Sequence, residues 1–460
     1  MASNRVIADL PNSKVRRRSK AAACFFVLMM PKAGRLLLFL WPMLVRADDL
    51  DLDAYIARQM AEGGIPSLSA RVILGKNTTT WASAYGDRDV GTGEPATVDT
   101  LYTHASISKT VISFAVMMLE ERGVLDLDAD VGGYLGYSVR NPGFPDVPVS
   151  LRMLMSHVSS VSDDDYFRIY PEYAVEGDPT VAMGDFCEML FTARAAQQFD
   201  PSHAPGTSYS YSNIGATLAA CAAERAAIAA RLLAADGTFD DLALGLVMAP
   251  LGVGAAGEAG YLYEDIDAAA WPIAMPSLAL GRARYRDRCL YGYPDYADGM
   301  WKASTASYAQ LFATFVNNGT SPSGAALLRP ATVAEMRREQ YPGVPGAAGQ
   351  GLVWYAEASV LGAGHADLLG HSGGDLGVAT DAFFDPTTGA GFVVYTNGDW
   401  DCATCAFSRA MANIEARILR TFGPYGGATA DASVARRRDG AEHHPSRRVG
   451  KVGAALCSHV

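Results

Sequence analysis

Apolar positions recur along the chain with two different spacings, and each spacing predicts one kind of secondary structure. The spacing of three to four residues that marks an amphipathic helix predicts helices at residues 51–62, 149–156, 217–235, 304–317, 331–340 and 406–422. Alternation of apolar and polar residues predicts strands at residues 67–74, 78–85, 351–355, 368–371, 378–384 and 391–396. Residues 75–77 and 385–389 are turn-forming, so the first two strands are expected to form a hairpin.

The order of these segments predicts the fold class. Strands lie near both ends of the chain, whereas the middle is mainly helical. One antiparallel sheet made from the N-terminal hairpin and the C-terminal strands, with helices on both faces, would bury these apolar stripes. We therefore expect an α+β fold, an α/β sandwich with an additional all-helical region. Residues 159–200 and 255–294 have no clear pattern, and no element is predicted there.

The N-terminal region contains two short apolar blocks, residues 21–30 and 36–45, separated by Pro31 and two charges. Each block has about half of the roughly 20 residues that a membrane-spanning helix needs. The second block has a basic lead and ends in Val-Arg-Ala before Asp48, which fits the cleavage pattern of a signal peptide. Residues 1–47 are therefore expected to be a signal peptide and the protein to be secreted. The alternative is an uncleaved anchor that attaches the protein to a membrane through both blocks.

The amino-acid composition is that of an ordinary globular protein. The 460 residues are 49% hydrophobic and 19% charged, and the formal net charge is −11. Basic residues gather at the two ends, so the body of the chain is more acidic than this value and is not expected to bind nucleic acid. Residues 48–423 are predicted to form the folded domain. Residues 424–460 are rich in arginine and small residues without apolar periodicity, and are expected to be a disordered basic tail.

Seven cysteines are present, and export would permit disulfides. Candidate pairs are Cys187 with Cys221, and Cys289 with either Cys402 or Cys405. The last two cysteines also have the spacing of a zinc-ligand pair, but no second Cys or His pair accompanies them, so zinc is not expected.

The strongest candidate chemistry is the pair Ser106 and Lys109, at the start of an apolar helix expected to begin near Ser106 and to end at Gly123. Residues at i and i+3 project from one helix face. A serine hydroxyl is a weak nucleophile until a base removes its proton, and a lysine can do so only as a neutral amine. Burial and a helix N-terminus both lower a lysine pKa. A serine and a lysine at this spacing also arise by chance as a cap or a solvated pair, so partners elsewhere must support the assignment.

Two later segments offer such partners. Tyr211 would shuttle a proton if neighbouring cations lower its pKa, and Asn213 would donate its side-chain amide to a substrate carbonyl. Gly373 and Gly374 leave backbone room for a substrate along a strand edge. Each has a structural alternative: the tyrosine packs in a turn, the asparagine caps the next helix, and the glycines form a turn.

The order of these three elements resembles the serine β-lactamase and penicillin-binding-protein superfamily, in particular the class C β-lactamase-related group with its esterases and D-peptidases. Ser106 to Lys109 matches the S-x-x-K element, residues 211–213 match a Y-x-N element, and residues 371–373 occupy the position of the third element. The resemblance extends over residues 51–422 and implies a β-lactamase/transpeptidase-like fold.

The resemblance also implies a role for each matched residue. Ser106 would be the acylated nucleophile, Lys109 its base, and Tyr211 the proton shuttle that also activates the deacylating water. The implied substrate contacts are Asn213, His371, Ser372 and Gly373, and the implied oxyanion hole consists of the backbone N–H groups of Ser106 and Gly374. No metal or cofactor is implied. His371 stands where β-lactamases carry lysine, and because histidine is mostly neutral at pH 7, efficient β-lactam hydrolysis is not expected.

The sequence thus predicts an exported serine hydrolase that forms an acyl-enzyme on Ser106 and cleaves an ester or amide, as carboxylesterases and D-peptidases do. Its substrate would be a small molecule, a peptide or an ester, with selectivity set by residues 163–200 and 255–298. The alternative, left open by the missing third-element lysine, is a catalytically inactive binding or scaffold protein of the same fold.

Overall fold

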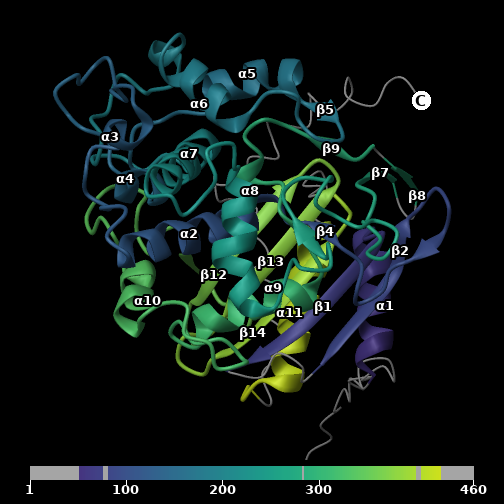
Figure 1. Ribbon diagram of the computed structural model, residues 1–460. Coiled ribbons are helices and arrows are strands. Elements are labelled where there is room, and N and C mark those ends of the chain that lie inside the picture. Colours follow the sequence, from purple (N-terminus) through teal and green to yellow (C-terminus); the bar gives the residue numbers. More distant parts are fainter. Residues whose placement is uncertain (1–50, 76–80, 282–283, 288, 400–405, 426–460) are drawn as a thin grey trace, which may run out of the picture. The chain divides into compact units, whose positions relative to one another are not determined.

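The computed structural model describes residues 51–75, 81–281, 284–287, 289–399 and 406–425 (Figure 1). All of them belong to one compact unit of the chain. The predicted signal peptide or anchor at residues 1–47 and nearly all of the predicted tail at residues 424–460 lie outside this part, so both stay predictions. Within the described ranges, no helix combines the length and apolar character needed to cross a membrane.

The described residues build a seven-stranded antiparallel sheet from both ends of the chain (Figure 1). Its hydrogen-bonded order is β11 (Tyr355–Glu357), β12 (Leu368–Asp375), β13 (Val378–Phe384), β14 (Ala390–Thr396), β1 (Ser67–Leu74), β2 (Ala82–Asp89) and β3 (Glu94–Pro95). The N-terminal hairpin joins the C-terminal strands where β1 pairs with β14. The predicted sheet is thus confirmed.

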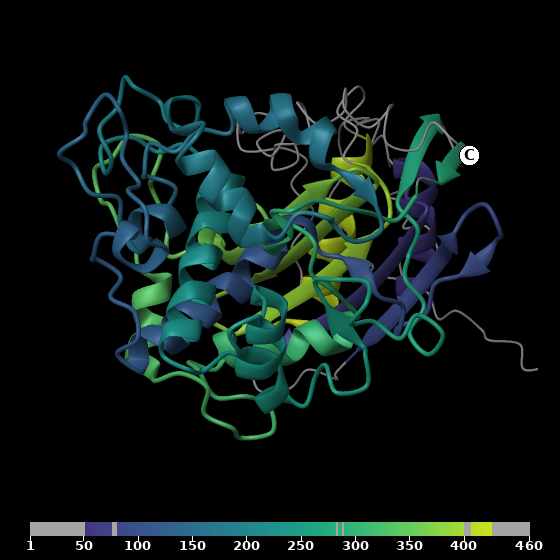
Figure 2. The ribbon, with the colours of Figure 1, turned by 45° about the horizontal axis from the view of Figure 1, so that its top comes forward.

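The helices are distributed between the two faces of this sheet and a separate helical region (Figure 2). In chain order they are α1 (Leu52–Gly63), α2 (Lys109–Glu121), α3 (Gly132–Leu135), α4 (Leu151–Met155), α5 (Asp164–Tyr173), α6 (Met183–Phe191), α7 (Asn213–Ala229), α8 (Phe239–Leu242), α9 (Thr305–Val316), α10 (Pro330–Arg337) and α11 (Ala406–Phe422). The alanine-rich α7 is buried on most sides and contacts α2, α3, α4, α6 and α8. The predicted all-helical region is confirmed.

Alternate side chains of the central strands enter two separate cores. Val72 of β1 and Phe392 of β14 pack with α1 and α11 on one face of the sheet. Ile73 and Val393, the next residue along each strand, join the larger core with α2 and α9 on the other face. Successive side chains of a strand point to opposite faces. Because both faces of the sheet are covered, neighbouring positions such as Val72 and Ile73 are both apolar and both buried.

Short strands connect the loops around the sheet. They are β4 (Tyr102–Thr103) with β10 (Lys302–Ala303) and β6 (Ala259–Gly260), β5 (Val175–Glu176) with β9 (Tyr291–Gly292), and β7 (Ser277–Gly281) with β8 (Arg284–Asp287). The pairing of β4 with β10 is antiparallel and fixes the chain three residues before Ser106. It therefore anchors the segment that carries the candidate nucleophile.

Most predicted helix ends are correct to within a few residues, and Ser150 and Ser304 cap α4 and α9. The largest difference is in α7, which begins at Asn213 rather than at residue 217. Ser212 caps this helix, because its Oγ accepts the N–H of Gly215 at 2.8 Å. The suggestion that Asn213 is the cap is therefore wrong by one residue, and its side chain is left for another role.

Two predicted strands are misplaced. The strand expected at residues 351–355 is mostly a loop, because the N–H groups of Leu352 and Val353 donate to carbonyls of α10 and α4 at 2.9 and 2.7 Å instead of to a neighbouring strand. The strand expected at residues 78–85 lies four residues later, as β2. The strand that carries His371 is longer than expected, since β12 pairs with β13 along its whole length.

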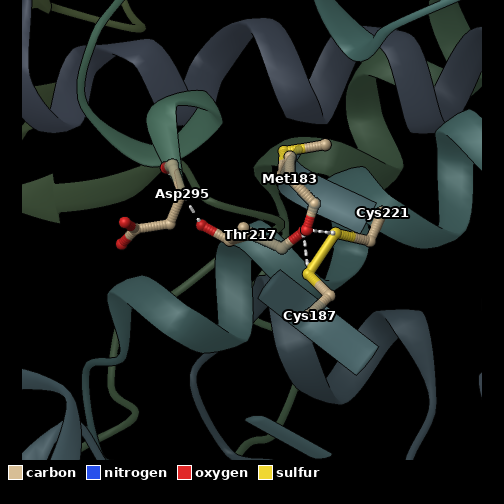
Figure 3. Close-up of a disulfide and its surroundings, with 5 residues drawn as sticks. All are labelled: Met183, Cys187, Thr217, Cys221 and Asp295. Atoms are coloured by element: carbon tan, nitrogen blue, oxygen red, sulfur yellow. Dashed lines mark hydrogen bonds between the residues drawn. A yellow bond between two sulfur atoms is a disulfide. The ribbon is translucent and has the colours of Figure 1, made fainter. Parts of the chain in front are cut away.

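One candidate disulfide is confirmed between α6 and α7. Figure 3 shows the bond between Cys187 and Cys221, together with Thr217, whose hydroxyl donates to the carbonyl of Asp295 at 3.3 Å. The helix that begins at Asn213 is thus tied to two neighbouring segments. Cys289 is also disulfide-bonded, but its two proposed partners, at positions 402 and 405, lie outside the described residues.

Candidate active site

Ser106 and Lys109 lie side by side at the start of α2. The expected α-helix begins at Lys109 rather than near Ser106, since residues 105–108 form a 3₁₀ helix, η2 (Ala105–Ser108). Ala105 has φ +47°, in the left-handed region that non-glycine residues rarely adopt, so the turn before the serine is strained. Ser106 is 8% exposed and Lys109 is fully buried. The lysine Nζ lies 3.1 Å from the serine Oγ.

Two further acceptors hold the amine of Lys109. Its Nζ donates to Oδ1 of Asn213 at 2.7 Å and to the carbonyl of Asp298 at 2.9 Å. A neutral amine has two hydrogens and one lone pair, so with both hydrogens donated here the lone pair faces the Ser106 hydroxyl. Burial lowers the pKa of Lys109, and the Asp298 carboxylate opposes this shift without reversing it. The arrangement is that of a general base on a serine.

The Asp298 carboxylate sets the pH at which this base is available. Its Oδ2 lies 3.9 Å from the Lys109 Nζ, and its own pKa is raised to about 7, mainly by burial. The ionised carboxylate stabilises the ammonium form and so raises the pKa of Lys109. In Asp298→Asn this pKa falls, and the acidic limb of kcat/KM against pH, measured on a neutral p-nitrophenyl ester, is expected to move about one unit lower.

The control for this prediction is Asp146→Asn, which removes an exposed carboxylate with no described partner. Its pH profile should coincide with that of the parent. An acidic limb that stays in place or moves to higher pH in Asp298→Asn would show that Lys109 is not the titrating base.

Tyr211 is buried against the same lysine. The Nζ of Lys109 lies 5.2 Å from the centre of the phenol ring, and the His157 ring packs on the phenol at 4.3 Å between centres. The Tyr211 hydroxyl has no hydrogen-bond partner within the described ranges. The condition that neighbouring cations lower its pKa is not met: burial raises the pKa well above its usual value, the nearby Ser106 hydroxyl lowers it only partly, and carboxylates add to the increase. Tyr211 is therefore a neutral phenol that can donate a proton.

Asp163 holds the segment of residues 211–213 in place, and sequence reasoning missed this role. Its Oδ1 accepts the Ser212 hydroxyl at 2.7 Å, and its Oδ2 accepts the N–H of Asn213 at 2.8 Å. His157 accepts the N–H of Ser212 at 3.2 Å through Nδ1. A carboxylate at a helix N-terminus is favourable. No local signal identifies Asp163, because it lies fifty residues from the groups that it binds.

His371 and Ser372 lie on β12. Burial lowers the pKa of His371 to about 3, and Lys109 contributes to the shift. The side chain is thus neutral at pH 7, more firmly than an unperturbed histidine would be. The Ser372 hydroxyl is engaged by the Tyr355 hydroxyl at 2.6 Å. The assignment of both residues as substrate contacts stays a prediction.

Gly373 brings β12 against the backbone of the candidate nucleophile. A Cβ atom at this position would lie 2.4 Å from the carbonyl of His104 and 3.0 Å from the N atom of Ser106. Only glycine permits this approach, which places the next residue, Gly374, at the pocket beside Ser106. The predicted pair of N–H donors is therefore sterically compatible with the structure.

Gly373→Ala should separate β12 from η2 and lower kcat/KM by about a hundred- to a thousandfold, the range of one lost oxyanion donor or a small misplacement. Steady-state kinetics on a p-nitrophenyl ester measure this. The control is Gly245→Ala, where an added Cβ meets nothing within 4 Å. Equal kinetics in the two variants would contradict a close contact between the strand and the serine.

A pocket opens beside Ser106, and Asn213 and Gly374 also line it. Lys109 and Tyr211 lie behind this lining. Within the described part of the chain, no group of three or more His, Cys, Asp or Glu side chains is arranged to hold a metal ion. The predicted elements from three distant segments thus converge on one small cavity.

The fold and the converging elements define a protein of the serine β-lactamase and penicillin-binding-protein superfamily. The family model described as Beta-lactamase matches residues 52–401, and the chain belongs to this family. Penicillin-binding protein 4* of Bacillus subtilis (strain 168) is 26% identical over 145 residues, which are 31% of this chain and 29% of that protein. The chain therefore matches less than a third of the length of this relative.

Solved structures share the fold at low sequence identity. The octameric penicillin-binding protein homologue from Pyrococcus abyssi has a TM-score of 0.61 at 22% identity, over 79% of this chain and 76% of that chain. D-alanine carboxypeptidase AmpC from Burkholderia cenocepacia has a TM-score of 0.57 at 18% identity, over 81% of this chain and 99% of that chain. The predicted β-lactamase/transpeptidase-like fold is confirmed.

Proposed function

We propose that the protein is an exported serine hydrolase that forms an acyl-enzyme on Ser106 and cleaves an ester or amide of the carboxylesterase or D-peptidase type. The observation that carries the proposal is the position of the Lys109 amine, buried and 3.1 Å from the Ser106 hydroxyl with its other hydrogens engaged. An amine of lowered pKa in that position is what a serine nucleophile requires.

In acylation, Lys109 accepts the Ser106 proton while the serine Oγ attacks the substrate carbonyl carbon. The negative charge on the carbonyl oxygen would be stabilised by the N–H groups of Ser106 and Gly374. The C–O or C–N bond then breaks, and the leaving group takes a proton from the phenol of Tyr211. Lys109 returns the serine proton to Tyr211, which restores both groups and leaves the ester on Ser106.

In deacylation, water attacks the acyl carbon and transfers one proton to the neutral amine of Lys109, which then passes it to the Ser106 Oγ. The bond from the acyl carbon to the Ser106 Oγ breaks, and the serine regains its proton. The acid is released, and the site returns to its starting state. Asn213 acts throughout by holding the amine, since its Oδ1 accepts from Nζ at 2.7 Å.

The likeness to a D-alanine carboxypeptidase supports the peptidase alternative. His371 argues against efficient β-lactam turnover, because its lowered pKa leaves no cation at the position where β-lactamases hold one for the substrate carboxylate.

Covalent labelling tests the proposed function. A fluorophosphonate probe should modify the protein once, and mass spectrometry should locate the adduct on Ser106. Ser106→Ala should remain unlabelled. Absence of an adduct, together with no hydrolysis of p-nitrophenyl esters, D-amino-acid amides or nitrocefin, would instead support the inactive scaffold.

Export rests on the apolar pattern of residues 36–47 alone. N-terminal sequencing of the protein from its native source should begin at Asp48. Residues upstream of Asp48 in the mature protein would contradict cleavage there and favour the retained anchor.

A further inference from the structure

The pocket beside Ser106 is acidic and aromatic. Beyond the predicted site residues, six side chains characterise its lining: Tyr166, Phe167, Tyr170, Tyr293, Asp298 and Asp375. Among the described residues that line it, none is a lysine, arginine or histidine. Such a lining therefore attracts positively charged groups.

The two carboxylates of the pocket come from different segments of the chain. Asp298 contacts the amine of Lys109 at 3.9 Å. Asp375 directly follows Gly374 on β12, and its Oδ2 accepts the hydroxyl of Tyr293 at 3.0 Å. Asp375 remains partly exposed, so a substrate group can reach it. Burial raises the pKa of both carboxyls, and the positive charge of Lys109 opposes this shift without reversing it.

The aromatic side chains add a second, independent observation. Tyr170 is 4% exposed and lines the pocket, yet its hydroxyl has no hydrogen-bond partner in the described structure. Its ring packs against Tyr166 and Tyr293, with centres 5.5 and 5.1 Å apart. Buried hydroxyls nearly always have a partner, so an orphan in a pocket indicates a ligand group. The faces of such rings also attract cations.

We propose that the substrates carry a free ammonium group close to the scissile carbonyl, as amino-acid esters and amides with an unblocked amine do, and that Asp375, Tyr170 and Tyr293 form its subsite. This inference rests on the proposed function and names its substrate class. An α-amino ester or amide has its nitrogen two bonds from the carbonyl carbon. With that carbon at Ser106, the ammonium group falls among the lining residues of the same pocket.

The opposite substrate class is disfavoured by the same lining. A carboxylate near the scissile carbonyl would be repelled by Asp298 and Asp375, and an N-acylated amine would bring no positive charge to them. The ammonium group instead offers hydrogen bonds to Asp375 and to the unpartnered Tyr170 hydroxyl. Specificity would then come from the acid on β12 rather than from His371.

Matched substrates test the inference. The set is the p-nitroanilides and methyl esters of D- and L-alanine, each with a free amine, an N-acetyl or an N-succinyl group, with p-nitrophenyl acetate as a neutral reference. We expect kcat/KM for at least one free-amine enantiomer to exceed that of its N-acetyl form by tenfold or more, with the N-succinyl form lowest. Equal or faster cleavage of the N-acetyl forms would overturn the inference.

The neutral reference substrate, p-nitrophenyl acetate, separates this inference from the proposed function. Hydrolysis of p-nitrophenyl acetate and labelling of Ser106 without an ammonium preference would refute the inference and leave the proposed function standing. No hydrolysis of any substrate and no labelling would refute both.

Variants locate the subsite. Asp375→Asn should lower the ratio of kcat/KM for the free-amine form over the N-acetyl form by about tenfold, mainly through KM. Tyr170→Phe, which keeps the ring, should lower the same ratio severalfold. Asp146→Asn, the exposed-carboxylate control, should not change it. Thermal unfolding verifies that each variant is folded, and an unchanged ratio in both folded pocket variants would place the subsite elsewhere.

Discussion

Ser106→Ala is expected to reduce kcat/KM by at least about a thousandfold, since loss of the nucleophile removes the covalent route and leaves only residual stabilisation by the oxyanion donors. The free energy of unfolding should change by about 1 kcal/mol or less, because one hydrogen bond with the Lys109 amine is lost. Kinetics on p-nitrophenyl esters and thermal unfolding measure the two effects.

The matched control is Ser113→Ala. Ser113 is buried on the same helix, α2, and its hydroxyl donates to the carbonyl of Leu352 at 3.0 Å, away from the pocket. This variant should lose stability but retain kcat/KM within about threefold. Full activity of folded Ser106→Ala on the same esters would disprove the acyl-enzyme.

Lys109→Met is expected to lower kcat/KM by about a hundred- to ten-thousandfold, the range of a lost general base. Methionine approximates the length of the lysine stem and is apolar, so it can fill the buried space without an amine. The acceptors on Asn213 and Asp298 lose a donor. The acidic limb of kcat/KM against pH, which Lys109 controls, should also disappear. A purely structural defect would not remove it.

A second fully buried lysine provides the control. The Nζ of Lys302 donates to the carbonyls of Tyr261 and Met300 at 2.5 and 3.0 Å and lies over the ring of Tyr263. Lys302→Met removes an amine that is as buried as that of Lys109 but has no hydrogen bond to Ser106. It should lower the melting temperature while the folded protein keeps kcat/KM within about threefold. Comparable activity losses in the two variants would assign Lys109 a structural role only.

Local patterns were sufficient for the outline of the fold. Period-two and helical spacing located most of the elements. Predictions failed where a distant partner decided the conformation. Leu352 and Val353 have strand-like sequence, yet their N–H groups bond to helices that lie far from them in the chain. Nothing within a few residues encodes such a bond.

Predictions of the candidate site succeeded or failed for the same reason as those of the fold. The spacing of Ser106 and Lys109 places both on one side of one turn, and this holds for the 3₁₀ turn as it would for an α-helix. The resemblance supplied the other matched residues. It did not supply Asp163 or Asp298, because each acts on the site from a segment without a recognisable pattern.

The sequence by itself determined the candidate pair Ser106 and Lys109, the two-sided burial of the central strands and the family. Tertiary structure alone decided the ionisation of the site, because a pKa depends on burial and on charges that the fold brings near. Burial in the fold raises the pKa of Tyr211, and it lowers the pKa of His371 well below that of an unperturbed histidine. The tertiary structure also decided the charge of the pocket, since Asp298 and Asp375 come from separate segments and meet only when the chain is folded.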